Sequence, residues 1–232
     1  MPYLPFIKDE DLKKHVQWVL RIAESSSEDE DFFKNSIDPF SAIFDAVRQQ
    51  ISLSEWKKLE KMRQGQKTLQ NRLGEFHQAI LGSMKGWENL ETGQLVDIKS
   101  VEKKIIAEIK NKHNTVKGSD KIAIYDNLEF ALSKTYESYK GYYVEIIPQA
   151  KKQYDRLFTP SDNKTKERRL ENERIRVIDG VSFYSLASGY SNALKMLYEI
   201  LPEVISDVTG ITVEKIIEDD MFKTLFDNTF SE

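Results

Sequence analysis

The sequence predicts one α/β domain in which helices flank a mixed β-sheet. Apolar residues recur at helical spacing in several long segments, and short apolar or alternating runs between them are typical of strands. The order is helices, a strand hairpin, a crossover helix, more strands and then more helices, which favours a sheet with both parallel and antiparallel pairs. No internal repeat or long linker divides the chain. We therefore expect a single domain over 1–232, with a helical part at 1–70, a central core at 71–150, and a basic connection, a strand and C-terminal helices at 151–232.

Three helical stretches are expected before the first strand. The segment 9–23 places apolar residues on one side, and its first turn is acidic. Residues 38–63 are expected to form one or two helices, with Asp38 as a cap before Pro39 and a restart at Ser52 or Ser54. A further helix is expected within 67–87. His77 lies beside the apolar stripe of that helix, which favours a packing role over a ligand role.

Four strands are expected in the rest of the chain. The first covers 94–99, and a polar connection at 100–104 leads to the second, which contains Ile105, Ala107 and Ile109 in alternation with more polar positions. The third ends at Pro148, and the fourth is expected after Arg174, either as a continuous strand or with a turn at Asp179–Gly180. Helices are expected to begin near Asp120, to cover 190–208, and to end the chain as a short acidic segment.

Composition excludes several classes of protein. The chain has 232 residues, 40% of them hydrophobic, and no cysteine, so disulfides, thiolate catalysis and Cys-based zinc sites are excluded. Its start lacks a basic region followed by an apolar stretch, and no apolar run reaches the ~20 residues that cross a membrane. These features predict a cytoplasmic protein.

The modest net charge of −4 conceals two basic segments. Residues 98–121 contain seven basic and three acidic residues, and residues 151–176 contain nine and five, so each segment has a balance of +4. Both ends of the chain are acidic. Two basic segments within an acidic protein indicate a surface for a polyanion, although each could also be an ordinary solvated loop.

Common catalytic motifs are missing from the sequence. Neither a P-loop nor a G-x-G-x-x-G motif is present, and no G-x-S-x-G elbow occurs. His15, His77 and His113 are scattered without zinc-site spacing. Carboxylate chemistry is what remains.

One charged pair interrupts the most apolar strand. Glu108 and Lys110 are two residues apart, so they share a face of the strand, and this pair is either a surface salt bridge or part of a site. If residues 100–104 turn the chain back, Asp97 lies across the hairpin from Glu108. Two carboxylates in such a position form a hard oxygen site suited to Mg²⁺, and Lys110 could stabilise charge on a phosphate.

The spacing of Asp97, Glu108-Ile109-Lys110 resembles the D…(D/E)-x-K motif of the PD-(D/E)XK nuclease superfamily. The resemblance implies a restriction-endonuclease-like fold, with Asp97 and Glu108 as ligands of Mg²⁺ and Lys110 as the residue that positions the attacking water. Val96 occupies the position of the family's loosely kept proline. Many members carry another acidic residue on the helix before the hairpin, and Glu75 is the candidate here, as a further metal ligand or a partner of one.

Two longer segments make the resemblance more specific. "IIAEIKNKHNTVKGS" and the opening "LPFIKDEDLKKHV" are similar to type II restriction endonucleases that cut GGNCC or GGWCC sites. This implies a Mg²⁺-dependent enzyme that cuts double-stranded DNA, acts as a homodimer on a palindrome, and is paired functionally with a DNA methyltransferase. A structure-specific or repair nuclease of the same fold, and a non-catalytic DNA-binding module, are the alternatives.

The two basic segments provide the candidate DNA-binding residues. Lys112 and Lys117 suit phosphate contact, Asn114 could pair with adenine or bond the backbone, and arginines are the usual readers of guanine. The candidates are Lys112, His113, Asn114, Thr115, Lys117, Arg168, Arg169, Arg174 and Arg176, and Lys164 and Lys166 belong to the second basic stretch.

Overall fold

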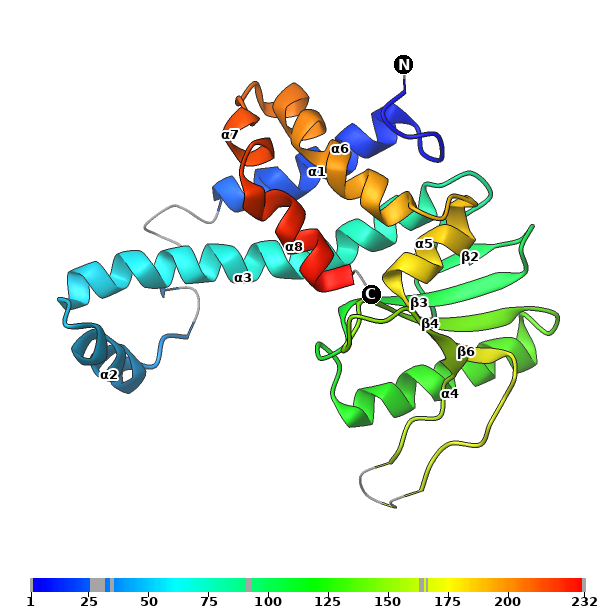
Figure 1. Cartoon of the computed structure of the whole chain (residues 1–232). Coiled ribbons are helices and arrows are strands. Elements are labelled where there is room, and N and C mark those ends of the chain that lie inside the picture. The colour runs from blue at the N-terminus through cyan, green and yellow to red at the C-terminus, as the bar shows by residue number, and fades with distance from the viewer. Residues whose placement is uncertain are drawn as a thin grey trace.

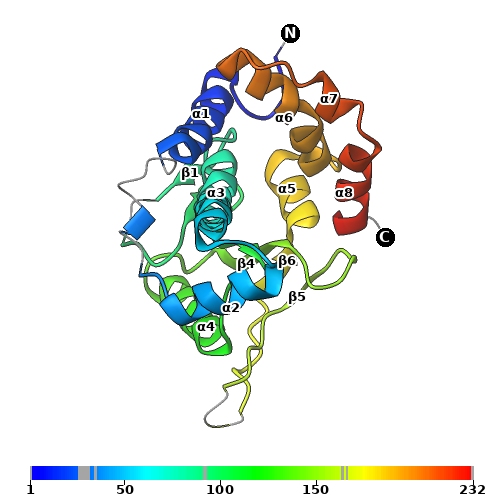
Figure 2. The same cartoon turned by 90° about the vertical axis from the view of Figure 1, so that its left-hand side faces the viewer.

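A six-stranded mixed sheet lies between two layers of helices (Figures 1 and 2). The computed structural model describes residues 2–25, 32–33, 36–90, 93–162, 165 and 167–230. Its helices are α1 (Asp9–Ser25), α2 (Pro39–Gln49), α3 (Leu53–Gly82), α4 (Gly118–Lys134), α5 (Gly180–Ser188), α6 (Ala193–Thr209), α7 (Glu214–Ile217) and α8 (Asp220–Phe230). Its strands are β1 (Glu88–Asn89), β2 (Ile98–Ser100), β3 (Ile105–Lys112), β4 (Lys140–Ile147), β5 (Asp155–Leu157) and β6 (Ile175–Asp179). The α/β fold class predicted from the sequence is confirmed.

The sheet has the strand order β1-β2-β3-β4-β6-β5. β3 and β4 are parallel, as are β4 and β6, while the other neighbouring pairs are antiparallel. α4 is the crossover between β3 and β4 and covers one face of the sheet. α1, α3, α5 and α6 cover the other face, as Figure 2 shows.

The alternation in β3 places its side chains as predicted. Ile105, Ala107 and Ile109 belong to the core under α1 and α3, whereas Ile106 is buried on the α4 side. Glu108 follows Ile106 at the strand's period of two and therefore lies on the α4 side, towards the end of the strand.

The helix caps were predictable from the sequence. The Asp38 side chain accepts a hydrogen bond from the Phe40 amide, and Pro39 takes the first helical position of α2. Ser52 and Glu55 form a reciprocal capping box at the start of α3. From there α3 continues unbroken to Gly82, so the segments expected as separate helices are one helix that crosses the expected boundary at residue 70.

Two strand predictions were wrong in extent. The segment 94–99 was expected to be a strand, but the ladder begins only at Ile98. The fourth strand was expected either to continue past Asp179 or to turn at Asp179–Gly180, but the segment from Gly180 is α5, because the buried Asp179 side chain accepts from the Ser182 amide and caps a helix. Gly180 is required at this junction, since a Cβ there would lie 2.3 Å from the Ile146 carbonyl oxygen. The short strands β1 and β5 were not predicted.

None of the described helices combines the length and apolarity needed to cross a membrane.

His77 packs inside the protein, as its position beside the apolar stripe indicated. Its Nδ1 lies 2.8 Å from the Tyr184 hydroxyl, and its ring meets the rings of Phe76 and Tyr184 edge to face. Burial lowers the pKa of His77 to about 4 from an ordinary 6.5.

The free energy of unfolding should therefore fall as the pH drops below 6.5. The unfolded chain protonates His77 near pH 6.5, whereas the folded chain keeps it neutral until about pH 4, so the unfolded state binds more protons in this window. The loss attributable to His77 should reach about 3 kcal/mol by pH 4. Urea unfolding between pH 7.5 and 4.5 measures it, and His77→Gln should show a shallower pH dependence. Equal slopes for parent and variant would contradict the assignment.

Candidate active site

The β2–β3 hairpin brings Asp97 to the middle of β3. The Asp97 amide donates to the Ala107 carbonyl at 3.0 Å, and its carboxylate Oδ2 accepts from the Ile109 amide at 2.7 Å. The side chain therefore replaces the main-chain acceptor that β2 would have supplied had it been longer. Asp97 is held beside Glu108 by the backbone of the strand that carries Glu108.

Glu108 and Lys110 form an ion pair near the end of β3. Lys110 Nζ lies 2.6 Å from Glu108 Oε1, and the two side chains are 32% and 18% exposed. They are thus accessible to a ligand while shielded from bulk solvent on most sides. The three residues expected to converge do so.

Burial makes the charges of the two carboxylates costly. It raises the pKa of Asp97, while the Ile109 amide and the Lys110 ammonium oppose this rise. Burial also raises the pKa of Glu108, the Asp97 charge raises it further, and Lys110 lowers it. Two carboxylates that repel each other in a poorly solvated place favour the approach of additional positive charge.

The donor set fits a divalent cation. The hydrogen bonds engage Oδ2 of Asp97 and Oε1 of Glu108, so within the described part of the chain the second oxygen of each carboxylate has no hydrogen-bond partner. In the same residues no group of three or more His, Cys, Asp or Glu side chains is positioned to hold a metal. Two carboxylate oxygens with water completing the shell is how proteins commonly hold Mg²⁺.

A cavity of about 270 Å³ opens beside these residues, between α3 and β3. Asp97, Lys110 and Glu75 line this candidate catalytic cavity, whereas Glu108, on the α4 side of β3, does not. Glu75 is held by Arg72, whose guanidinium lies 3.0 Å away. The amides of Gln70, Asn71, Gln78 and Asn111 also line the cavity and were not singled out from the sequence.

Comparison with known proteins assigns the chain to a family. The family model for the Eco47II restriction endonuclease matches residues 4–210. The chain belongs to the Eco47II restriction endonuclease family. It is 40% identical over 210 residues to the type II restriction enzyme Eco47II of Escherichia coli, covering 88% of this chain and 87% of the relative. It is also 32% identical over 212 residues to the type II restriction enzyme Sau96I of Staphylococcus aureus, covering 88% and 80%.

Membership of this family confirms the resemblance to type II restriction endonucleases. The protein is a type II restriction enzyme, a site-specific deoxyribonuclease that acts on double-stranded DNA. Enzymes of this class generally require a divalent metal, in agreement with the paired carboxylates at the hairpin.

The first basic segment includes the end of β3 and the chain that follows it. Lys112 ends β3, Asn114 and Lys117 are exposed, and Thr115 lines the catalytic cavity. His113 is anchored by its amide to the Ile147 carbonyl at 3.0 Å, and its buried Nδ1 has no hydrogen-bond partner among the described residues. Of this segment, Thr115 lies at the cavity that Asp97 and Lys110 line.

The second basic segment is largely engaged within the protein. Arg169 makes a two-pronged ion pair with Asp126 at 2.7 and 2.8 Å, Arg174 donates to the Glu137 carbonyl at 2.6 Å, and Arg176 pairs with Asp155. Among the residues that the structure describes, the Arg168 side chain donates to the Thr159 carbonyl and to no carboxylate. These contacts are between residues distant in sequence, so charge counting could not anticipate them. Lys164 and Lys166 lie outside the described residues.

A second carboxylate–lysine pair was missed. Glu145 in β4 is 5% exposed, and Lys121 at the start of α4 lies 2.7 Å from it. The Tyr154 hydroxyl donates to the other oxygen of Glu145 at 2.5 Å. The available signal was the one that marked Glu108, since Glu145 is a single charge inside the apolar run of β4.

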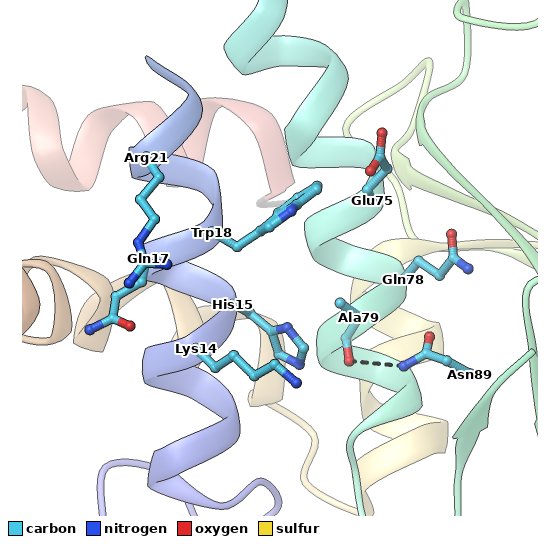
Figure 3. Close-up of a pocket in the computed structure, with 9 residues that line it drawn as sticks. All are labelled: Lys14, His15, Gln17, Trp18, Arg21, Glu75, Gln78, Ala79 and Asn89. Carbon is cyan, nitrogen blue, oxygen red and sulfur yellow. Dashed lines mark hydrogen bonds between the residues drawn. The ribbon is translucent and has the colours of Figure 1, made fainter. Parts of the chain in front are cut away.

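A larger groove of about 700 Å³ runs between α1 and α3 (Figure 3). Lys14, Trp18 and Arg21 line it from α1, and Glu75 and Gln78 line it from α3. Because Glu75 and Gln78 also line the catalytic cavity, the groove adjoins that cavity.

Proposed function

We propose that the protein hydrolyses a phosphodiester bond in each strand of a GGNCC-like palindrome, in a Mg²⁺-dependent reaction at Asp97, Glu108 and Lys110. The observation that carries the proposal is the convergence of these three side chains at the β2–β3 hairpin of a restriction-enzyme chain. The two named relatives are type II restriction enzymes, which supports cleavage of DNA at a specific sequence. The carboxylates of Asp97 and Glu108 support Mg²⁺ as the metal.

The residues divide the work of hydrolysis. Asp97 and Glu108 would hold Mg²⁺, which when bound supplies a Lewis acid to the phosphate and to water. Lys110 provides three N–H donors beside Glu108, where it can orient the attacking water and stabilise the charge that develops on the phosphate oxygens. Glu75 faces the same cavity and can order water there. Bond cleavage is the attack of water on phosphorus with departure of the bridging oxygen.

Digestion of a sequenced plasmid with and without Mg²⁺ tests this function. Defined fragments whose ends share one palindromic sequence are expected only with the metal. Cleavage restricted to junctions, flaps or mismatches would support a structure-specific nuclease instead. Binding without cleavage at any divalent metal would support a non-catalytic module and contradict the proposal.

We also propose that the enzyme works in the cytoplasm beside a cognate DNA methyltransferase. An enzyme that cuts a short palindrome would otherwise cut the host chromosome, so the host copies of the site require modification. The partnership is functional and needs no contact between the two proteins.

The exposed face of α2 supports a homodimer. α2 lies at the far end of the long helix α3 (Figure 1), where Ala42 and Ala46 pack against Trp56. Its other face exposes the large apolar side chains Phe40 (72%), Ile43 (54%), Phe44 (76%) and Val47 (71%). This i, i+3, i+4, i+7 pattern is a continuous stripe of the kind that marks an interface. A palindromic site requires two-fold symmetry, so we propose that the stripe packs on its own copy.

Phe44→Glu should convert the dimer to a monomer at micromolar concentration. A charge in the centre of an apolar two-fold contact is introduced twice and repels itself, while the exposed position leaves the monomer fold intact. Light scattering measures the mass, and slower cutting of both strands at low enzyme concentration should accompany the change. Ile211→Glu, at a 64% exposed position after α6, is the control. A Phe44→Glu protein that remains dimeric would place the interface elsewhere.

A further inference from the structure

A second polar cavity lies on the α4 side of the sheet. It has a volume of about 490 Å³ and is bounded by the N-terminus of α4, by β4, β5 and β6, and by the chain following β5. Its charged members are Lys121, Glu145, Arg156 and Arg168. It shares no residue with the catalytic cavity, which lies between α3 and β3.

A buried tyrosine forms part of the wall of this cavity. Tyr143 is fully buried, and its hydroxyl is closed to solvent beside the Glu145 carboxylate. Its ring packs against Phe158 with 4.9 Å between centroids, and Lys121 Nζ lies 5.4 Å from the ring centroid. The groups that a ligand would meet are therefore the charged side chains of the cavity.

The charge of the cavity favours an anion. Glu145 is already neutralised by Lys121 at 2.7 Å and accepts a hydrogen bond from Tyr154. Arg156 lies over the Tyr154 ring, Arg168 donates to a carbonyl, and neither has a carboxylate partner in the described part of the chain. Two guanidinium groups therefore remain for a ligand, and their planar forks match the oxygens of a phosphate.

The strand register connects this cavity to the catalytic strand. β3 and β4 are parallel, with Glu108 opposite Tyr143 and Lys110 opposite Glu145. Burial raises the pKa of Tyr143 most, followed by the charge and hydrogen bond of Glu145 and by Tyr154, and the Glu108 charge adds a smaller contribution. The cavity is therefore one strand away from the residues that would receive the scissile phosphate.

We propose that this cavity binds a second phosphate of the DNA strand being cut, near the scissile one, through the guanidinium groups of Arg156 and Arg168. This inference depends on the proposed function, in which the DNA strand is cleaved beside Lys110. A second fixed phosphate would hold the strand in register over the catalytic residues, since phosphate contacts set position while base contacts set sequence.

Neutralising single phosphates tests the contact. A set of cognate duplexes, each carrying one uncharged methylphosphonate near the cut, is bound by the parent protein and by Arg168→Ala and Arg156→Ala. We expect one position at which neutralisation weakens binding by the parent about tenfold but has little further effect on either variant, because each variant has already lost the same contact. Lys195→Ala, which removes an exposed lysine on α6, should keep the full sensitivity of the parent.

Inorganic phosphate distinguishes the source of the anion. Millimolar phosphate should give no larger rise in melting temperature for the parent than for Arg168→Ala, because the DNA strand supplies the other contacts that hold the group. The opposite result has two parts: phosphate strongly raises the melting temperature of the parent but not of Arg168→Ala, and at every position the effect of the methylphosphonate adds to that of the substitution. That result would make the cavity a site for a free anion and overturn the DNA contact. A parent that cuts plasmid DNA at one site but shows no coupled position would refute this inference alone, whereas a parent that never cuts would refute the proposed function.

Discussion

Lys110→Ala should reduce the single-turnover rate of DNA cleavage by about 10²–10³-fold. The ammonium lies 2.6 Å from Glu108 Oε1, and Lys110 lines the cavity that Asp97 lines, so it places a positive charge beside the expected metal and phosphate. Its loss leaves both carboxylates in place. Metal binding should therefore persist, and it should not weaken, because a competing positive charge has been removed.

Lys110→Arg should restore little of the rate. A planar guanidinium is bulkier than an ammonium and cannot release a proton near neutral pH. Pre-bound DNA mixed with Mg²⁺ separates the chemical step from affinity. Lys195→Ala, on α6, provides the control for loss of one lysine. A Lys110→Ala enzyme that cuts within about threefold of the parent would reduce the lysine to a partner of Glu108 with no part in the chemistry.

Asp97→Asn should abolish metal-dependent cleavage while the fold survives. The amide oxygen of asparagine can still accept from the Ile109 amide, which the carboxylate engages at 2.7 Å, so the local structure has its hydrogen bond. The negative charge and the metal ligand are lost. Since a bound metal contributes several kcal/mol to catalysis, the rate should fall about 10³-fold or more.

Asp97→Ala should be inactive for two reasons. It removes the ligand, and it leaves the amide of the buried Ile109 without its acceptor, which should lower the free energy of unfolding by about 1–3 kcal/mol. In urea unfolding, the free energy of unfolding of Asp97→Asn should therefore lie near that of the parent, and that of Asp97→Ala should lie well below it.

The stabilisation of Asp97→Asn by Mg²⁺ provides an independent readout. The parent should gain thermal stability on addition of the metal, and this gain should be absent in the variant. Glu88→Gln, which removes an exposed carboxylate in β1, should keep both the stabilisation and the activity. Normal cutting by Asp97→Asn would show that the metal is held elsewhere.

Local patterns in the sequence were enough to predict the positions of most elements. Asp38 before Pro39, Ser52 before Glu55 and the alternation around Ile106 each involve neighbours within a few residues, and each is present in the structure. The spacing of Asp97 to Glu108 across a short turn belongs to the same category, because a hairpin must bring its two arms together. The family resemblance was carried by Asp97, Glu108 and Lys110 and by the two segments quoted with them.

What the sequence could not show depends on contacts between distant segments. The length of β2 was overestimated because the Asp97 side chain substitutes for a main-chain acceptor. The helix after Asp179 forms because that aspartate is buried and caps it, and only Gly180 can approach the Ile146 carbonyl so closely. At both places, before Ile98 and after Asp179, the local sequence does not differ from that of a continuing strand.

The fold class, the family and the three catalytic candidates could be derived from the amino-acid sequence, because each depends on residues close together along the chain. Which basic residues remain unengaged depends on the folded structure. Arg169, Arg174 and Arg176 are engaged by Asp126, Glu137 and Asp155, which are 43, 37 and 21 residues away. Conversely, the cavity on the α4 side joins Tyr143, Arg156 and Arg168 from separate segments. A charge is visible in a sequence, but its partner is set by the packing of elements that meet only in the folded chain.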